Sequence, residues 1–87
     1  MTFYIEFSDD AKADILFFQK AGDKSILTKI KMLILTIQES PFSGIGKPEL
    51  LKHQFSGLWS RRINREHRMI YKVEKELITI LSLKGHY

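Results

Sequence analysis

The side chains that could do chemistry are concentrated between residues 41 and 71. This stretch contains two acids, six cations and two imidazoles: Glu49, Glu66, Lys47, Lys52, Arg61, Arg62, Arg65, Arg68, His53 and His67. Cations at this density form either a solvated surface or a binding site for a polyanion. We favour the polyanion site. A further histidine and a tyrosine end the chain, as His86 and Tyr87.

Three of these residues have the types that cleavage of RNA without a metal requires. Glu49 could act as the base for a 2′-hydroxyl, Arg68 as the cation for the phosphorane, and His86 as the acid for the leaving 5′-oxygen. An imidazole can release a proton near neutral pH. Arg62 and Arg68 can each hold two phosphate oxygens at once, which a lysine cannot do.

Simpler interpretations of the same residues remain open. Glu49 could be an exposed surface acid. Arg68 could form a structural ion pair with Glu66 or Glu74. His86 could belong to a frayed terminus, although the apolar segment before it favours a terminus held in a sheet.

The aromatic and remaining histidine side chains give weaker signals. Trp59 could stack on a base or pack in the core, and Tyr87 could stack on a nucleobase beside the proposed acid. His53 and His67 have no cysteine or metal-binding spacing around them, so we expect neither a metal nor another cofactor.

Charge is distributed unevenly along the 87 residues. Residues 1–40 carry five Lys and six acids, whereas residues 41–87 carry five Lys, four Arg and four acids. The basic second half suggests an anionic partner. The length predicts a single domain over 1–87, and the lack of cysteine, signal sequence and long apolar run predicts a soluble, cytoplasmic protein without membrane contact.

The pattern of the first half predicts a strand and two helices. Residues 2–7 are aromatic and β-branched, and Ser8 or Asp9 can cap a helix that runs to about Ala21. Asp23 caps a second helix with a wide apolar stripe, which ends at the residue before Pro41. Met32 and Leu35 lie off that stripe and could form a dimer surface or the rim of the core.

The second half predicts a loop and four strands. The loop covers residues 41–49, and the expected strands are 50–55, 58–64, 67–73 and 77–87. The order β-α-α-β-β-β-β predicts an α+β fold, with two helices on one face of a mainly antiparallel sheet. Alternation along neighbouring strands lets Arg62, Arg68 and His86 converge on one face, where the preceding loop can bring Glu49.

The run PFSGIGKPELLKHQFSGLWSRRINREHRMIY and the ending HY closely resemble the YoeB/Txe family of toxins, within the RelE-like group. The resemblance extends over the whole chain. It implies a RelE-like microbial ribonuclease fold and a toxin that cleaves mRNA in the ribosomal A site without a metal. The expected product is a 2′,3′-cyclic phosphate.

The resemblance also implies a role for individual residues. The acid of GKPE, Glu49, corresponds to the general base, and the arginine of EHR, Arg68, to the transition-state stabiliser. The terminal HY supplies the general acid His86 and the aromatic Tyr87.

Three further positions are implied to contact or orient the substrate. Lys52 resembles the family's substrate-contacting lysine, and Arg62 is the expected phosphate contact. Glu66 is the expected electrostatic neighbour of the arginine in EHR.

The resemblance implies three partners: an antitoxin of the YefM/Axe type, the ribosome and mRNA. It also implies that the complex with the antitoxin binds operator DNA and that the toxin can form a homodimer. A non-catalytic module that binds nucleic acid and acts with an antitoxin as co-repressor is the alternative. A third hypothesis is a protein that only binds a partner and has lost its catalytic site. The presence of Glu49, Arg68, His86 and Tyr87 argues against this hypothesis.

Overall fold

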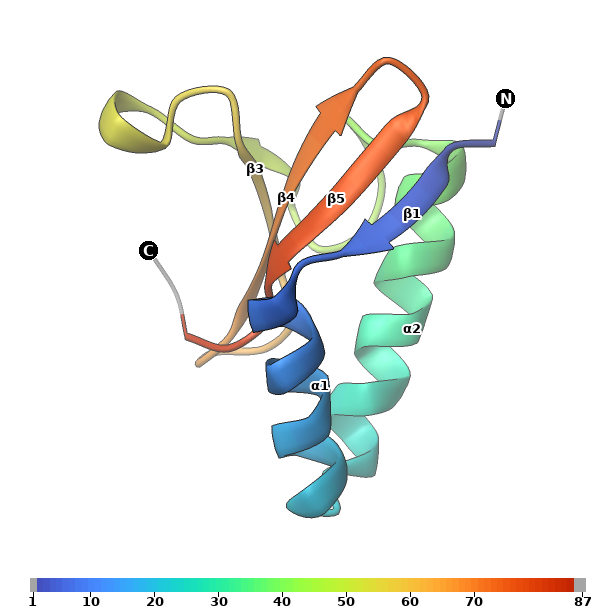
Figure 1. Cartoon of the computed structure of the whole chain (residues 1–87), viewed down its shortest axis with the longest axis vertical. Coiled ribbons are helices and arrows are strands. Elements are labelled where there is room, and N and C mark those ends of the chain that lie inside the picture. The colour runs from blue at the N-terminus through green and yellow to red at the C-terminus, as the bar shows by residue number, and fades with distance from the viewer. Residues whose placement is uncertain (1, 86–87) are drawn as a thin grey trace.

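The computed structural model describes residues 2–85, which form a five-stranded sheet with two helices. The elements in chain order are β1 (Tyr4–Phe7), α1 (Asp9–Lys20), α2 (Lys24–Glu39), β2 (Glu49–Leu50), a short 3-10 helix η1 (His53–Phe55), β3 (Trp59–Arg62), β4 (Arg68–Glu74) and β5 (Leu77–Ser82). The strands lie in the order β1-β5-β4-β3-β2, and both helices lie on one side of the sheet (Figure 1). The predicted α+β architecture is confirmed. The sheet is mixed, because β1 pairs with β5 in parallel.

Both helices begin at the predicted caps. Ser8 Oγ accepts a hydrogen bond from the Ala11 amide at 3.1 Å, and Asp23 Oδ1 accepts one from the Ile26 amide at the same distance. These contacts satisfy amides that have no partner inside the helix. Ser8 Oγ also donates to the carbonyl of Leu81 at 2.8 Å, so the cap of α1 is tied to the end of β5.

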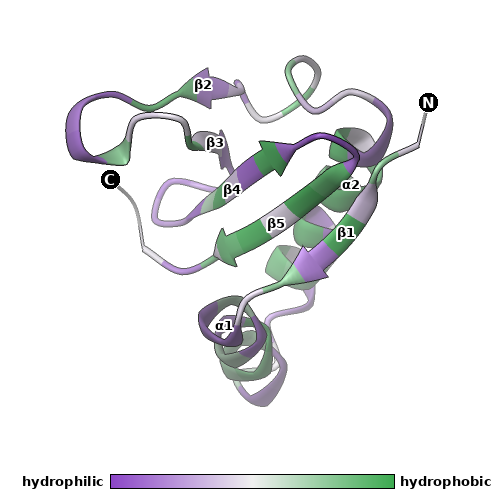
Figure 2. Ribbon diagram, turned by 45° about the horizontal axis from the view of Figure 1, so that its top comes forward, coloured by the Kyte–Doolittle hydropathy of each residue, from purple (hydrophilic) through white to green (hydrophobic). Residues whose placement is uncertain are grey.

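The core lies between the helices and the sheet. The apolar stripe of α2 is buried there, together with one face of β4 and β5; the fully or nearly fully buried residues are Ile26, Ile30, Leu33, Ile37, Met69, Tyr71, Ile78 and Ile80. Figure 2 shows β5 mostly in the hydrophobic colour. The exposed side chains of Met32 and Leu35 lie outside this core. Among residues 2–85, no helix has the length and apolar character to cross a membrane.

The predicted strand at 50–55 is wrong. Only Glu49 and Leu50 pair with β3, and η1 follows after Lys52. His53 has a positive φ of 59°, which turns the chain out of the extended conformation. The local tendency of this segment to form a strand is overridden, and Lys52 stands at the start of the turn.

The predicted final strand at 77–87 is too long. β5 ends at Ser82, and Asp14 of α1 then accepts hydrogen bonds from the amides of Leu83 and Lys84 at 2.9 and 3.2 Å. A side chain of α1 replaces the sheet as the partner of these amides. The alternation expected along this strand therefore stops at Ser82, and His86 lies outside the described residues.

A fully buried arginine joins the sheet to the loop after α2. Arg61 donates to Tyr71 Oη at 3.0 Å and to the carbonyls of Ser40, Ser43 and Ile45 at 2.7, 2.7 and 2.9 Å. All four acceptors are neutral oxygens. A buried charge is tolerated only when hydrogen bonds replace its water, so this loop must close around the guanidinium.

The loop then returns to the sheet at Gly46, whose carbonyl accepts from the Arg62 amide at 2.6 Å. Gly46 has a φ of +85°, and a Cβ there would lie 2.9 Å from Leu33 Cδ2 and 3.2 Å from both Arg61 Cβ and the Arg62 carbonyl oxygen. Gly57 has a similar φ of +91° but nothing within 4 Å of an added Cβ.

We predict that Tyr71→Phe lowers the free energy of unfolding by about 1–3 kcal/mol, because the Arg61 Nε–H and the Pro41 carbonyl each lose a buried partner. Burial raises the pKa of Tyr71 above its ordinary 10.0, against the opposing effect of Arg61. The unfolded chain therefore loses this proton first, and wild-type stability falls as the pH rises above about 10. Urea unfolding at several pH values measures both effects. A variant as stable as wild type at neutral pH would contradict the role of this hydroxyl.

We predict that Gly46→Ala destabilises the protein by about 1–3 kcal/mol more than Gly57→Ala. Both alanines occupy a left-handed conformation, but only the one at 46 also collides with backbone and core atoms. Parallel thermal and urea denaturation of the two variants gives the difference. Equal losses of stability would show that the loop relaxes freely around residue 46.

Candidate active site

The face of the sheet opposite the helices brings most of the proposed site residues together. Glu49 of β2 pairs with Ser60 of β3, and one row further along, Arg62 of β3 pairs with Arg68 of β4. Residues paired across strands project to the same face, and so do residues two apart on one strand. One acid and two arginines therefore share a small area of open sheet.

Ser60 links the two rows. Arg68 Nη1 donates a hydrogen bond to Ser60 Oγ at 3.4 Å, and Ser60 is fully buried. The contact directs the guanidinium of Arg68 along the sheet toward the row that contains Glu49. The proposed ion pair between Arg68 and Glu74 is not formed, since Glu74 pairs with Lys72 at 3.3 Å.

Arg62 and Arg68 stand directly opposite each other on neighbouring strands. Like charges in this position repel and destabilise a sheet by roughly 0.2–1 kcal/mol. An anion bound between them would relieve the repulsion, and two guanidinium groups can contact several oxygens of one phosphate. This arrangement is suited to a phosphodiester.

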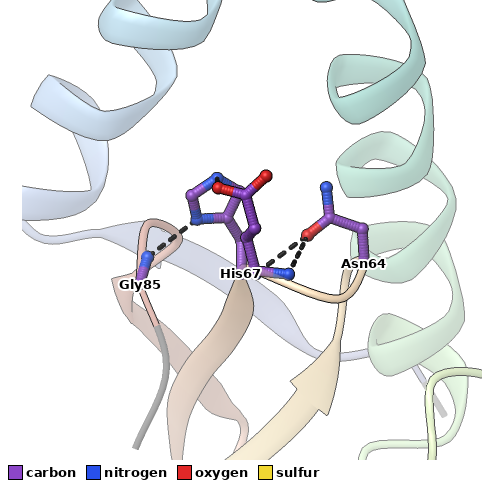
Figure 3. A network of polar contacts seen from close by, with 4 residues as sticks. Asn64, His67 and Gly85 are labelled. Atoms are coloured by element: carbon purple, nitrogen blue, oxygen red, sulfur yellow. Dashed lines mark hydrogen bonds and ion pairs between the residues drawn. The ribbon is translucent and has the colours of Figure 1, made fainter.

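The remaining substrate-contact candidates lie at the two ends of this face. Lys52 is exposed at the start of η1, and Glu66 is exposed in the turn between β3 and β4. That turn is built on Asn64, whose Oδ1 accepts from the amides of Glu66 and His67 at 2.9 and 2.8 Å (Figure 3). The connection between β3 and β4 is thus an Asn-centred turn.

The last described residue, Gly85, lies beside the start of β4. Its amide donates to His67 Nδ1 at 2.9 Å (Figure 3), and its carbonyl accepts from the Arg68 amide at 2.8 Å. His86 and Tyr87 lie outside the described residues, so their assignment stays a prediction. The described part of the chain ends at Gly85, which is hydrogen-bonded to the backbone of Arg68.

A pocket of about 240 Å³ opens on the same face, next to the row of Ser60 and Ile70. It is lined by Ser8, Asp10, Phe55, Leu58, Ile70, Leu81 and Ser82. The register of β4 and β5 shifts here, so that Ile70 pairs with Ser82 and Leu81 is passed over. Ser82 Oγ is buried without a hydrogen-bond partner.

Sequence reasoning missed Ser60 and His67 as parts of the site. The alternation that places Arg62 on the open face also places Ser60 there, so that signal was present. No local pattern could reveal His67, because its partner Gly85 is eighteen residues away. Trp59 contacts Phe42 and packs at the edge of the core, as its structural interpretation expected.

Within residues 2–85, no group of three or more His, Cys, Asp or Glu side chains has the arrangement of a metal site. The segment PFSGIGKP before β2 is a loop, and its Ser43 and Ile45 carbonyls accept hydrogen bonds from Arg61.

The family model described as the YoeB-like toxin of bacterial type II toxin-antitoxin systems matches residues 7–87. Toxin YoeB of Synechocystis sp. is 47% identical over 83 residues, which are 95% of each chain. The YoeB dimer of Staphylococcus aureus superimposes with a TM-score of 0.89 at 43% identity, and the toxin in the heterotetrameric YoeB-YefM complex of the same organism with 0.86 at 43%; each alignment covers 100% of both chains. The chain therefore belongs to the family of YoeB-like toxins of bacterial type II toxin-antitoxin systems.

Proposed function

We propose that this toxin is a ribosome-dependent endoribonuclease, which cleaves mRNA in the ribosomal A site without a metal and so inhibits translation in the cytoplasm. Membership of the YoeB-like family supports the proposal. The observation that carries it is the open sheet face, where the acid Glu49 lies one row from the opposed arginines Arg62 and Arg68.

In the proposed reaction, Glu49 accepts the proton of the 2′-hydroxyl, and the 2′-oxygen attacks the adjacent phosphorus. The bond from phosphorus to the 5′-oxygen breaks, and His86 gives that oxygen a proton. The products are a 2′,3′-cyclic phosphate and a 5′-hydroxyl. Arg68 stabilises the negative charge of the phosphorane, which is the largest electrostatic demand of the step.

The other residues hold the substrate. Arg62 and Lys52 contact phosphate oxygens, Glu66 acts as an electrostatic neighbour of the reacting groups, and Tyr87 stacks on a nucleobase. A carboxylate is a weak base for a hydroxyl, so positioning must supply much of the rate. A ribosome that holds the mRNA in line for attack would provide several kcal/mol of this positioning, which accounts for the dependence on it.

The proposed inhibitor is an antitoxin of the YefM/Axe type. The Staphylococcus aureus relative is known in a heterotetrameric complex with YefM and as a dimer. We propose that an acidic segment of the antitoxin covers the basic open face and that the toxin-antitoxin complex binds operator DNA. We also propose that the free toxin dimerises. The half-exposed Met32 and Leu35 are candidate contacts of that dimer.

The deciding experiment is cleavage of a defined mRNA positioned on ribosomes. Untagged protein keeps the native ending of the chain. We expect cuts confined to the A-site codon, no cleavage of ribosome-free mRNA, and loss of cleavage but not of ribosome binding in His86→Gln. Absence of cleavage by folded wild-type protein would favour the non-catalytic co-repressor, and joint loss of binding and cleavage would remove the acid role of His86.

The same assay tests the arginine. Arg68→Ala should lower the single-turnover cleavage rate by about 10²–10³-fold, the loss typical of removing one donor to a charged transition state. Arg65→Ala makes the same change of charge in the exposed turn and should leave the rate within about twofold. Similar losses in both variants would indicate that Arg68 contributes only overall charge.

Ribosome binding should depend steeply on salt. Three phosphate contacts with single-stranded RNA, from Lys52, Arg62 and Arg68, predict a slope of log K against log salt near −2.1, or about 20-fold weaker binding from 50 to 200 mM. Lys52→Ala should reduce the slope by about one, whereas Lys31→Ala, exposed on α2, should not change it. Equilibrium binding at several salt concentrations gives the slopes. A flat response would exclude docking through these cations.

A further inference from the structure

We propose that His67 is a positioning residue, whose imidazole holds the backbone of Gly85 and thereby fixes the residue to which His86 is joined. The inference rests on the proposed function, in which His86 is the general acid. It assigns a role to a side chain that the reaction scheme itself does not use.

The imidazole of His67 is itself held firmly. Its ring packs against the edge of the Phe18 ring, with centroids 5.1 Å apart and planes at 66°. Its backbone amide donates to Asn64 Oδ1 at 2.8 Å (Figure 3), and only 14% of its side chain is exposed. A ring that packs against Phe18 and is carried by a hydrogen-bonded backbone can serve as an anchor for another segment.

The anchored segment is the end of the described chain. Gly85 donates to His67 Nδ1 at 2.9 Å, so Nδ1 carries a lone pair and the neutral ring has its proton on Nε2. Nε2 faces Glu66 Oε2 at 4.0 Å. The Gly85 carbonyl accepts from the Arg68 amide at 2.8 Å, which places this residue against the strand that carries the proposed transition-state stabiliser.

The contact to His67 is separate from those that hold the preceding residues. Asp14 accepts from the amides of Leu83 and Lys84, and Leu83 is fully buried in the core. Among the described residues, His67 supplies the one side-chain hydrogen bond to Gly85. Removal of this bond should therefore loosen the chain at Gly85, which keeps the hydrogen bond from the Arg68 amide, while β5 and the core keep their packing.

The loosening would act on the rate of reaction rather than on substrate binding. A general acid must lie within about 3 Å of the oxygen that it protonates. A misplacement of about 1 Å can reduce a rate by roughly 10²-fold. His86 follows Gly85 directly in the chain, so a displaced Gly85 displaces the origin of that side chain.

The test compares His67→Leu with His67→Asn. Leucine keeps an apolar side chain against Phe18 but has no acceptor, whereas the Oδ1 of asparagine branches from Cγ in the same way as Nδ1 and can accept from Gly85. His53→Asn removes an exposed imidazole in η1, where asparagine tolerates the positive φ of 59°, and serves as the control. Single-turnover cleavage on ribosomes, ribosome affinity and exchange of the ¹⁵N-labelled Gly85 amide are measured for each variant.

We expect His67→Leu to cleave about 10- to 100-fold more slowly, with unchanged ribosome affinity and faster exchange at Gly85. His67→Asn should recover most of the rate and the slow exchange, and His53→Asn should resemble wild type. A His67→Asn variant as slow as the leucine variant, or wild-type cleavage by His67→Leu, would overturn the positioning role. Wild-type protein that cleaves no mRNA would instead overturn the proposed function, while the exchange measurement still reports whether His67 holds Gly85.

Discussion

The structure depends on the buried guanidinium of Arg61. Arg61 gives up its hydration inside the core and recovers hydrogen bonds from Tyr71 and from three carbonyls of the loop after α2. Because an unsatisfied buried guanidinium would cost several kcal/mol, the loop has little freedom to open. That loop leads directly into β2, so the position of Glu49 beside Ser60 follows from the requirement to satisfy Arg61.

Two neighbouring arginines in β3 have opposite tasks. Arg61 points into the core and organises the chain, whereas Arg62 is exposed on the face that we propose binds RNA. The same alternation in β4 separates buried Met69 from the partly buried Arg68. The side chains proposed to meet the substrate are therefore carried on strands whose other face is fixed by tight packing, which is how a chain of 87 residues can hold a site rigidly.

Much of the fold could be predicted from the sequence because local chemistry decides it. A serine or aspartate directly before an apolar stripe caps the helix that follows, as Ser8 and Asp23 do here. The alternation of side chains separates the two faces of β3 and β4. Long-range contacts could not be predicted in this way. Asp14 captures the amides after Ser82 and ends β5 early, and His53 turns the chain out of the expected strand through its positive φ. The burial of Arg61 also could not be predicted from the sequence, because arginine is among the residues least often found in a core.

The acceptors that surround Arg61 are almost all main-chain carbonyls, and every amino acid supplies one. The guanidinium of Arg61 therefore depends on the backbone conformation of the loop from Ser40 to Ile45 and not on the identity of the loop's side chains. Apart from Gly44 and Gly46, where an added Cβ would meet atoms at 2.9 Å, its sequence can drift during evolution without disturbing the guanidinium. The length of the loop cannot change in the same way, because one inserted or deleted residue would move the carbonyls away from the N–H groups of Arg61, which are fixed in the core. Lineages of this protein should thus tolerate substitutions in this loop far more readily than insertions or deletions.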